Sequence, residues 1–401
     1  MLSVEEARAR VLAPLAPLPA EVVALADAWG RVLAAPVLAR VANPPADVSA
    51  MDGFALRAAD GAPGARLRVV GEAPAGHPWP GRAGPGEAVR LYTGSVMPAG
   101  TDSVLLQEDA VRTGDAVEVR EAVRPGRHVR PAGQDFAVGD EVLPAGKRLG
   151  ARDVGLAAAA NRPWLAVRRR PRVALLATGD EIALPGEDVP PGGIVSSNTH
   201  ALAALVRAGG GEPALLPIAR DDRAALAEAA VGARGADLLV TTGGASVGDY
   251  DLVQAALGDE GFELDFWKVA MRPGKPLVSG RLGAMPVLGL PGNPVSALVC
   301  GLLFLLPALA RLSGLPGDPP APARARLGAP VAANDWRADH LRAGLRTEPD
   351  GTLVATPLAR QDSAMLRAFA DAGALILRAP GAPALPEGAA VSVLLLDALG
   401  L

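Results

Sequence analysis

Residues 237–251, DLLVTTGGASVGDYD, lead from an apolar strand through a glycine-rich loop toward a helix. The apolar run predicts a buried strand from Asp237 to Thr241, and a helix is predicted from Tyr250 to Leu257. Backbone N–H groups of such a loop, together with the positive end of the next helix, can hold an oxyanion or a phosphate. Three glycines and two hydroxyl side chains exceed what a tight turn needs, so the loop predicts an anion site.

Strands and helices alternate on both sides of this loop. The expected strands are Arg172 to Ala177, Ala214 to Ile218, Glu263 to Val269 and Pro286 to Leu290, and the expected helices are Thr199 to Gly209, Asp222 to Val231 and Val295 to Leu312. Alternation over about 140 residues predicts an α/β domain, residues 168–314, with a parallel sheet wrapped by helices. Ligands of such sheets bind in the loops beyond the carboxyl ends of the strands.

Acidic residues follow several of these strands. Thr178-Gly179-Asp180-Glu181 suits a metal or phosphate site, but a helix-capping Asp and a solvated Glu explain it equally well. Asp221 and Asp222 follow the second strand, where one of them is expected to cap a helix. Asp249 and Asp251 are metal ligands or caps.

Cations and rigid turns occupy the remaining loops. Arg272 and Lys275 lie in MRPGKP, residues 271–276. Lys275 is one of only three lysines in the chain, so either a compact ammonium is required at this position or the lysine is there by chance. Prolines on both sides of Gly292-Asn293 stiffen the turn before the last helix. Carboxylates beside anion binders indicate a divalent cation that bridges phosphate-like oxygens.

Composition restricts the class of protein. The 401 residues favour two to four domains, and a net charge of -4 offers no overall basic field for nucleic acid or a membrane surface. One cysteine, Cys300, and a start without the order of a signal peptide predict a reducing cytoplasm. The longest apolar run, Val295 to Leu309, contains Pro307 and is shorter than the roughly 20 residues of a membrane span, so it predicts a buried helix.

The flanking regions have a different pattern. Residues 1–45 begin with a helix, for which Ser3 and Glu6 form an expected capping box, and residues 136–167 return to turns and a helix. Residues 46–135 predict a small β domain with strands at 66–70, 88–91 and 103–106. The basic run 168–172 and the segment 314–322 are expected linkers, and residues 323–401 predict a C-terminal β module.

Several motifs, in order, resemble the molybdopterin molybdenumtransferase family, which includes bacterial MoeA, the E domain of gephyrin and plant homologues. They are MDGFA (51–55), TGSVMP (93–98), PGRHVRPAGQD (125–135), TGDEI (178–182), SSNTHAL (196–202), DD (221–222), TGGASVGDYD (242–251), RPGKP (272–276) and LGLPGNPVSAL (288–298). The resemblance spans essentially the whole chain. It implies an elongated domain from residues 1–45 and 136–167, an inserted β domain (46–135), a sheet domain (168–314) and a C-terminal β barrel (323–401).

The resemblance also implies an activity. Members of the family insert molybdenum from molybdate into adenylylated molybdopterin and release AMP, with Mg²⁺, as cytoplasmic homodimers whose active sites lie between subunits. Transient contact with other enzymes of molybdenum cofactor synthesis is a further expectation.

Site residues are implied position by position. Asp52 and Thr93 would come from one subunit, and the sheet domain of the other would supply the remaining catalytic residues, Glu181, Asp221, Asp251, Lys275, Pro291 and Pro294. Asp221 and Asp251, with Glu181, would hold Mg²⁺. The phosphates would lie on Gly243, Gly244, Ser246 and Gly248, and molybdate on Lys275, Arg272, Pro276, Asn293 and Ser296, with Arg342 and Ser363 from the C-terminal domain.

Two other functions compete with this one. The adenylyltransferase that makes the AMP-pterin shares the sheet domain, but residues 1–135 and the C-terminal module argue against it. A binding scaffold without catalysis is the second, since gephyrin also anchors receptors. The chain departs from the family pattern at Arg272, where lysine is common, at Ala245, where valine is usual, and along residues 360–366, which are only loosely similar.

Overall fold

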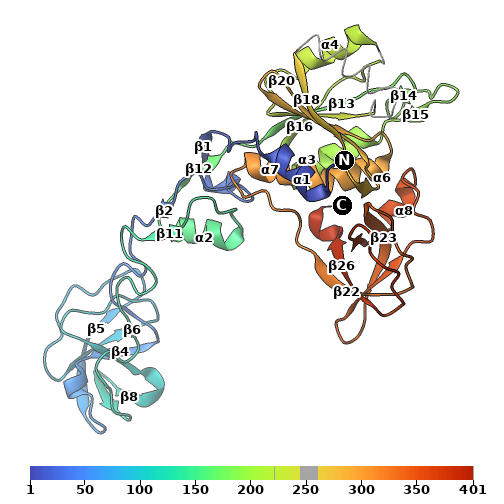
Figure 1. The fold of residues 1–401 in the computed structure, drawn as a ribbon. Coiled ribbons are helices and arrows are strands. Elements are labelled where there is room, and N and C mark those ends of the chain that lie inside the picture. Colours follow the sequence, from blue (N-terminus) through green and yellow to red (C-terminus); the bar gives the residue numbers. More distant parts are fainter. Residues whose placement is uncertain (221, 244–260, 401) are drawn as a thin grey trace. The chain divides into compact units, whose positions relative to one another are not determined.

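The computed structural model describes residues 1–220, 222–243 and 261–400. The chain divides into two compact units, one formed by Met1–Glu21 with Arg168–Leu401 and the other by Val22–Val167. The expected helix at 250–257 lies outside the described residues. Figure 1 shows the chain, with many elements of both units labelled.

A six-stranded sheet forms the centre of the first unit. Its strands lie in the order β16 (Glu212–Leu215), β13 (Arg172–Ala177), β17 (Leu238–Thr242), β21 (Met285–Leu290), β20 (Pro276–Leu282) and β18 (Phe262–Lys268). The first four are parallel, as expected. The expectation of an all-parallel sheet is wrong at β20, which was not predicted and runs antiparallel to both of its neighbours.

The exception has a local cause. The two-residue turn Gly283-Ala284 joins β20 directly to β21, and Gly283 adopts φ +58°, a backbone conformation that favours glycine and suits such hairpins. Because β18 and β21 both oppose β20, β18 runs in the same direction as the parallel strands. The loop after β18 therefore remains at the carboxyl edge of the sheet.

Helices cover both faces of the sheet (Figure 1). Side chains of β13 alternate between two cores: Val173 and Leu175 face α3 (Asn198–Ala208) and the apolar helix at 294–312, whereas Ala174 and Leu176 face α4 (Arg223–Gly232). Burial on both faces explains why the strand is apolar throughout.

The apolar helix consists of α6 (Pro294–Cys300), a π-helical segment (Gly301–Leu305) and α7 (Leu306–Leu312). Pro307 lacks a backbone donor and its ring crowds the preceding turn, which explains the wider π-helical segment before it. By length and composition this helix could cross a membrane, but 83% of its most apolar window is buried in the structure. The expected buried helix is therefore confirmed.

Helix α1 (Val4–Leu12) packs with the sheet and not with residues 136–167, which differs from the expected grouping. Its capping box is present: Ser3 Oγ accepts from Glu6 N at 3.1 Å and Glu6 Oε2 accepts from Ser3 N at 2.8 Å. The stripe Val4, Ala7 and Val11 is buried in the same core as α7, because this i, i+3, i+7 spacing gives the helix one apolar face.

The C-terminal part of this unit is a closed five-stranded barrel, which confirms the expected module. Strands β23 (Ala338–Thr347), β24 (Leu353–Pro357), β22 (Ala323–Leu327), β26 (Ala390–Leu395) and β25 (Ala374–Arg378) pair in that order, and β25 pairs back to β23. Short strand β19 (Met271–Arg272) of the sheet domain pairs with β23, and α8 (Leu366–Ala370) follows the barrel loop 361–365. The barrel is thereby joined to the loop that carries Arg272.

The second unit contains the expected inserted β domain. Its sheet has the order β7 (Ser103–Leu106), β4 (Gly53–Leu56), β6 (Glu87–Leu91), β5 (Arg66–Ala73), β9 (Ala116–Val119) and β8 (Ala110–Thr113). The rest of the unit consists of the pairs β2 (Val37–Leu38) with β11 (Glu141–Leu143) and β3 (Val48–Ser49) with β10 (Val129–Arg130), and of α2 (Ala151–Ala159). The unit begins within β1 (Ala20–Ala24) and ends within β12 (Trp164–Arg168).

Candidate active site

A cleft of about 940 Å³ lies where the carboxyl edge of the sheet meets the barrel loop 361–364. This volume is in the range of small-molecule sites. Ten residues that the sequence implicates line it: Glu181, Gly243, Arg272, Lys275, Pro276, Pro291, Asn293, Pro294, Ser296 and Ser363. Asp221, Gly244, Ser246, Gly248 and Asp251 lie outside the described residues.

Gly243, at the end of β17, shows why the glycine loop begins where it does. Its φ is +96°, and a Cβ atom there would lie 2.3 Å from the carbonyl oxygen of Thr178. Thr178 N also donates to Thr242 O at 3.0 Å, so the ends of β13 and β17 lie in direct contact. Only glycine fits this position without displacing the backbone.

Asn198, at the start of α3, was not predicted as a site residue, although the motif SSNTHAL contains it. Its Nδ2 donates to Thr242 Oγ1 at 2.8 Å and to the carbonyl oxygen of Gly292 at 2.7 Å. One side chain therefore fixes the end of β17 against the loop after β21, and it lines the cleft as well.

The loop after β18 presents Lys275 to the cleft. Gly274 has φ +107°, and a Cβ atom there would lie 2.5 Å from Cys300 Sγ, so the backbone packs tightly on α6. Val269 N donates to Lys275 O at 3.0 Å. Lys275 is exposed and forms no ion pair within the part of the chain that the structure describes. Its ammonium is available to an anionic ligand.

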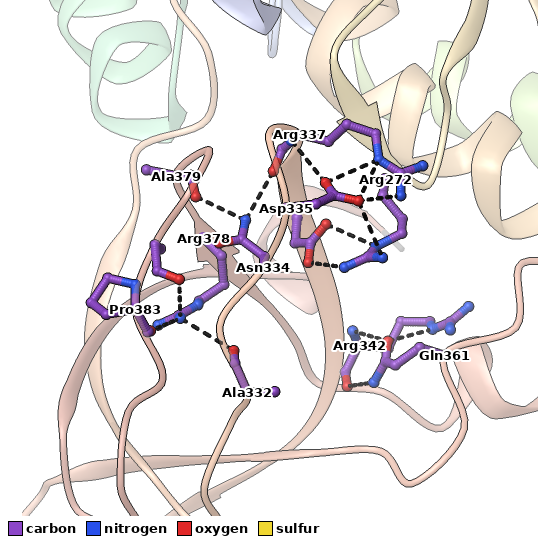
Figure 2. A network of polar contacts seen from close by, with 12 residues as sticks. Arg272, Ala332, Asn334, Asp335, Arg337, Arg342, Gln361, Arg378, Ala379 and Pro383 are labelled. Atoms are coloured by element: carbon purple, nitrogen blue, oxygen red, sulfur yellow. Dashed lines mark hydrogen bonds and ion pairs between the residues drawn. The ribbon is translucent and has the colours of Figure 1, made fainter.

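Arg272 lines the same cleft, but its charge is balanced. Its Nε donates to Asp339 Oδ1 at 2.9 Å, its Nη2 donates to Asp339 Oδ2, and its Nη1 lies 4.0 Å from Asp335 Oδ2 (Figure 2). Asp335 also accepts from Arg337 Nη2 at 2.6 Å. Hydrogen bonds from Arg337, with the nearby Arg272 charge, lower the pKa of Asp335 to about 2. Two arginines and two carboxylates thus form a network without net charge.

Arg342 does not line the cleft, contrary to its expected place beside the oxyanion. It is 1% exposed; its Nε donates to Gln361 Oε1 at 3.2 Å and its Nη1 to the carbonyl oxygen of Asp362 at 2.6 Å. Gln361 Nε2 donates back to the carbonyl oxygen of Arg342 at 2.9 Å, as Figure 2 shows for this pair. Burial lowers the pKa of Arg342. The side chain supports the loop that carries Ser363.

Ser363 and Asn293 are in direct contact. Asn293 Nδ2 donates to Ser363 Oγ at 3.0 Å, and Val295 N donates to the carbonyl oxygen of Ser363 at 3.1 Å. The barrel loop is therefore docked on the first turn of α6. Asn293 and Ser363 lie 70 positions apart in the sequence, and the fold brings them into contact, as the family resemblance implied.

Asp52 and Thr93, in the other unit, form a pair of their own. Asp52 Oδ1 accepts from Thr93 N at 2.7 Å and from Thr93 Oγ1 at 2.9 Å. These hydrogen bonds lower the pKa of Asp52, because they stabilise the ionised carboxylate. The two residues come from separate motifs, MDGFA and TGSVMP.

The described residues do not by themselves make a metal site. Of the three expected Mg²⁺ ligands only Glu181 is described, and no group of three His, Cys, Asp or Glu side chains suited to an ion occurs in residues 1–220, 222–243 and 261–400. Asp222 caps α4, since its Oδ1 accepts from Ala225 N at 2.9 Å. The expected capping aspartate is thus Asp222.

Comparison with known proteins agrees with this architecture. Family models match residues 2–161 (MoeA N-terminal region, domains I and II), 174–311 (probable molybdopterin binding domain) and 324–396 (MoeA C-terminal region, domain IV). A structure of the molybdopterin biosynthesis MoeA protein of Pyrococcus horikoshii superimposes with a TM-score of 0.85 at 30% identity, covering 98% of this chain and 99% of that one.

Curated relatives are also similar. The molybdopterin molybdenumtransferase of Nostoc sp. is 41% identical over 304 residues, which are 74% of this chain and 70% of that protein. The enzyme of the same name from Synechococcus elongatus is 33% identical over 409 residues, 98% of this chain and 99% of that protein. This chain therefore belongs to the molybdopterin molybdenumtransferase family.

Proposed function

We propose that this protein transfers molybdenum from molybdate to adenylylated molybdopterin and releases AMP. The main support is that residues from five separate chain segments, all implied at the site by the family resemblance, line one cleft. The segments contain Glu181, Gly243, Lys275, the run Pro291–Ser296 and Ser363. The names of the relatives support the reaction.

Lys275 is the proposed cation for the oxyanion. Molybdate is a dianion, and the ammonium of Lys275 supplies a compact positive charge to pair with it. Ser296, at the start of α6, also lines the cleft and carries a hydroxyl group that can form hydrogen bonds. Arg272 contributes less net charge, because Asp339 already neutralises it.

Mg²⁺ is part of the proposal, with Asp221, Asp251 and Glu181 as its ligands. A bound Mg²⁺ would offset the negative charge of the substrate phosphates. Glu181 supports this role by lining the cleft near the end of β13. The glycine loop, Gly243, Gly244, Ser246 and Gly248, would bind the phosphates through backbone N–H groups.

We further propose a cytoplasmic homodimer in which Asp52 and Thr93 of one subunit serve the cleft of the other. Mixing Asp52→Ala with Asp251→Ala protein tests this. Each variant alone should be inactive, whereas subunit exchange should restore about a quarter of wild-type activity, because mixed dimers have one intact site. Absence of recovery after proven exchange would contradict a site that is shared between the two subunits.

The activity is tested by mixing the protein with adenylylated molybdopterin, molybdate and Mg²⁺ and by measuring AMP. Release of AMP without ATP supports the transferase, whereas a requirement for ATP supports the adenylyltransferase. Asp221→Ala and Asp251→Ala should lose turnover. Asp222→Ala is the matched control, since it removes only a helix cap and should keep turnover. Full activity of both test variants would remove the metal assignment.

A further inference from the structure

One end of the cleft is apolar. Short strands β14 (Ile182–Ala183) and β15 (Ile194–Val195) pair in parallel, with Ile182 opposite Ile194, so these two side chains share one face. Ile194 N donates to Glu181 O and Ser196 N to Ala183 O, both at 2.8 Å, which fixes the pair in place. Ile182 and Ile194 both line the cleft, and we call these two residues the apolar shelf.

The aliphatic side chains of the shelf are partly exposed to solvent. Ile194 is 54% exposed and Ile182 is half-buried. Covering such side chains with an apolar surface is favourable, in proportion to the area removed from water. The shelf lies within the cleft itself, so a molecule bound in the cleft is the natural cover.

A hydrogen-bonding edge adjoins the shelf. Ser197 and Asn198, which follow β15 directly, also line the cleft. Both Nδ2 donors of Asn198 are used, on Thr242 and Gly292, whereas its Oδ1 accepts no hydrogen bond from the described residues. The hydroxyl of Ser197 makes no capping bond to α3. A carbonyl-type acceptor and a hydroxyl therefore remain for a ligand.

An apolar surface beside acceptors suits a flat ring that carries N–H donors on its edge. Lys275 lies on another loop of the same cleft and suits an anion. We propose that the apolar shelf binds a flat, amino-substituted heteroaromatic ring of the substrate, with Asn198 Oδ1 and Ser197 Oγ at the ring's polar edge. The inference rests on the proposed function, because adenylylated molybdopterin has two such rings, the pterin and the adenine.

The test uses substitutions that keep the β-branched shape. Ile182→Thr/Ile194→Thr exchanges apolar for polar surface on the shelf, and Ile194→Thr alone is a milder variant should the double variant not fold. Val189→Thr is the matched control, because Val189 is 44% exposed in the same segment but does not line the cleft. Melting temperature and circular dichroism verify folding.

Equilibrium binding of two probes, a simple pterin and AMP, is then measured by fluorescence or calorimetry on the full chain. The double variant should bind one probe about tenfold more weakly, with the control unchanged. Selective loss of pterin binding assigns the shelf to the pterin, and selective loss of AMP binding assigns it to the adenine. Unchanged binding of both probes, or no measurable binding by the unaltered protein, overturns the inference.

This readout needs no turnover. If the unaltered protein releases no AMP from the adenylylated pterin but the shelf variants lose ring binding, the proposed function fails and the shelf stands. If the unaltered protein releases AMP from the adenylylated pterin and the shelf variants bind both probes normally, only the proposal for the shelf fails.

Discussion

Arg272 and Asp339 occupy paired positions of β19 and β23, and their side chains join the sheet domain to the barrel. Asp339 is 2% exposed, and both of its oxygens accept from the guanidinium of Arg272. A carboxylate this deeply buried depends on its partner, because it has lost most of its hydration.

Replacing Asp339 by Ala should therefore weaken the attachment of the barrel. We expect a loss of about 2 kcal/mol in unfolding free energy, less than for a fully buried pair because Arg272 is half exposed. Urea titration measures it. Asp339→Asn should cost less, since the amide keeps one acceptor. A loss below about 0.5 kcal/mol for Asp339→Ala would show that the pair contributes little.

Lys275→Gln should raise the molybdate KM by about tenfold or more without changing the melting temperature. Among the described residues, Lys275 is the one cation that lines the cleft and is not paired with a carboxylate. AMP release as a function of molybdate concentration measures this. Lys268→Gln is the control: Lys268 Nζ lies 3.2 Å from the centre of the Trp267 ring, and the residue does not line the cleft. An equal rise of KM in both variants would contradict a specific role for Lys275.

Gln361→Glu should perturb turnover through the loop that carries Ser363. The amide Nε2 donates to the carbonyl oxygens of Arg342 and Leu358, both at 2.9 Å, and a carboxylate would face these oxygens without a proton to donate. We expect a fall of about tenfold in kcat with a small change in molybdate KM. A rise in KM with normal kcat would indicate that Gln361 or Arg342 contacts the oxyanion directly. Steady-state kinetics distinguishes the two.

His340 should make stability depend on pH. Burial lowers the pKa of His340 to about 4, against opposing effects of the Arg272 backbone, Asp339 and Glu5. The unfolded state, with an ordinary histidine, binds the extra proton first, so this contribution to stability is complete above about pH 6.5 and is lost as pH falls toward 4. The loss is about 2 kcal/mol at pH 5.

Unfolding of the wild type and of His340→Leu in urea at pH 7.5 and pH 5 tests this. The variant should lose less stability between the two pH values, because leucine does not titrate. An identical loss in both proteins would show that other groups govern the acid limb.

Gly243→Ala should be costlier than Gly186→Ala, although the two glycines have similar φ angles of +96° and +94°. A Cβ atom at Gly243 meets Thr178 O at 2.3 Å, whereas at Gly186 nothing lies within 4 Å. We expect about 1 kcal/mol for Gly186→Ala from backbone strain alone and about 3 kcal/mol for Gly243→Ala. Equal melting temperatures of the two variants would contradict the close approach of β13 and β17.

Local patterns in the sequence determined the elements and the order of the cleft's loops. The capping box at Ser3, the strands β13 and β17 and the buried helix at 294–312 depend on neighbours a few residues away, so they can be read along the chain. The parallel strands then place their carboxyl ends on one edge, which brings Glu181, Lys275 and Pro291 to the same cleft.

Only the tertiary structure decided the polar partners behind the cleft. The bond of Arg272 to Asp339, 67 positions away, depends on how the barrel packs on the sheet, and the bond of Arg342 to Gln361 depends on how the barrel folds on itself. No local pattern marks Asp339, because it lies in an ordinary strand segment. The neutralisation of the Arg272 charge and the burial of Arg342 both follow from these contacts. An ion pair forms where two side chains meet in space, and the fold alone sets that distance.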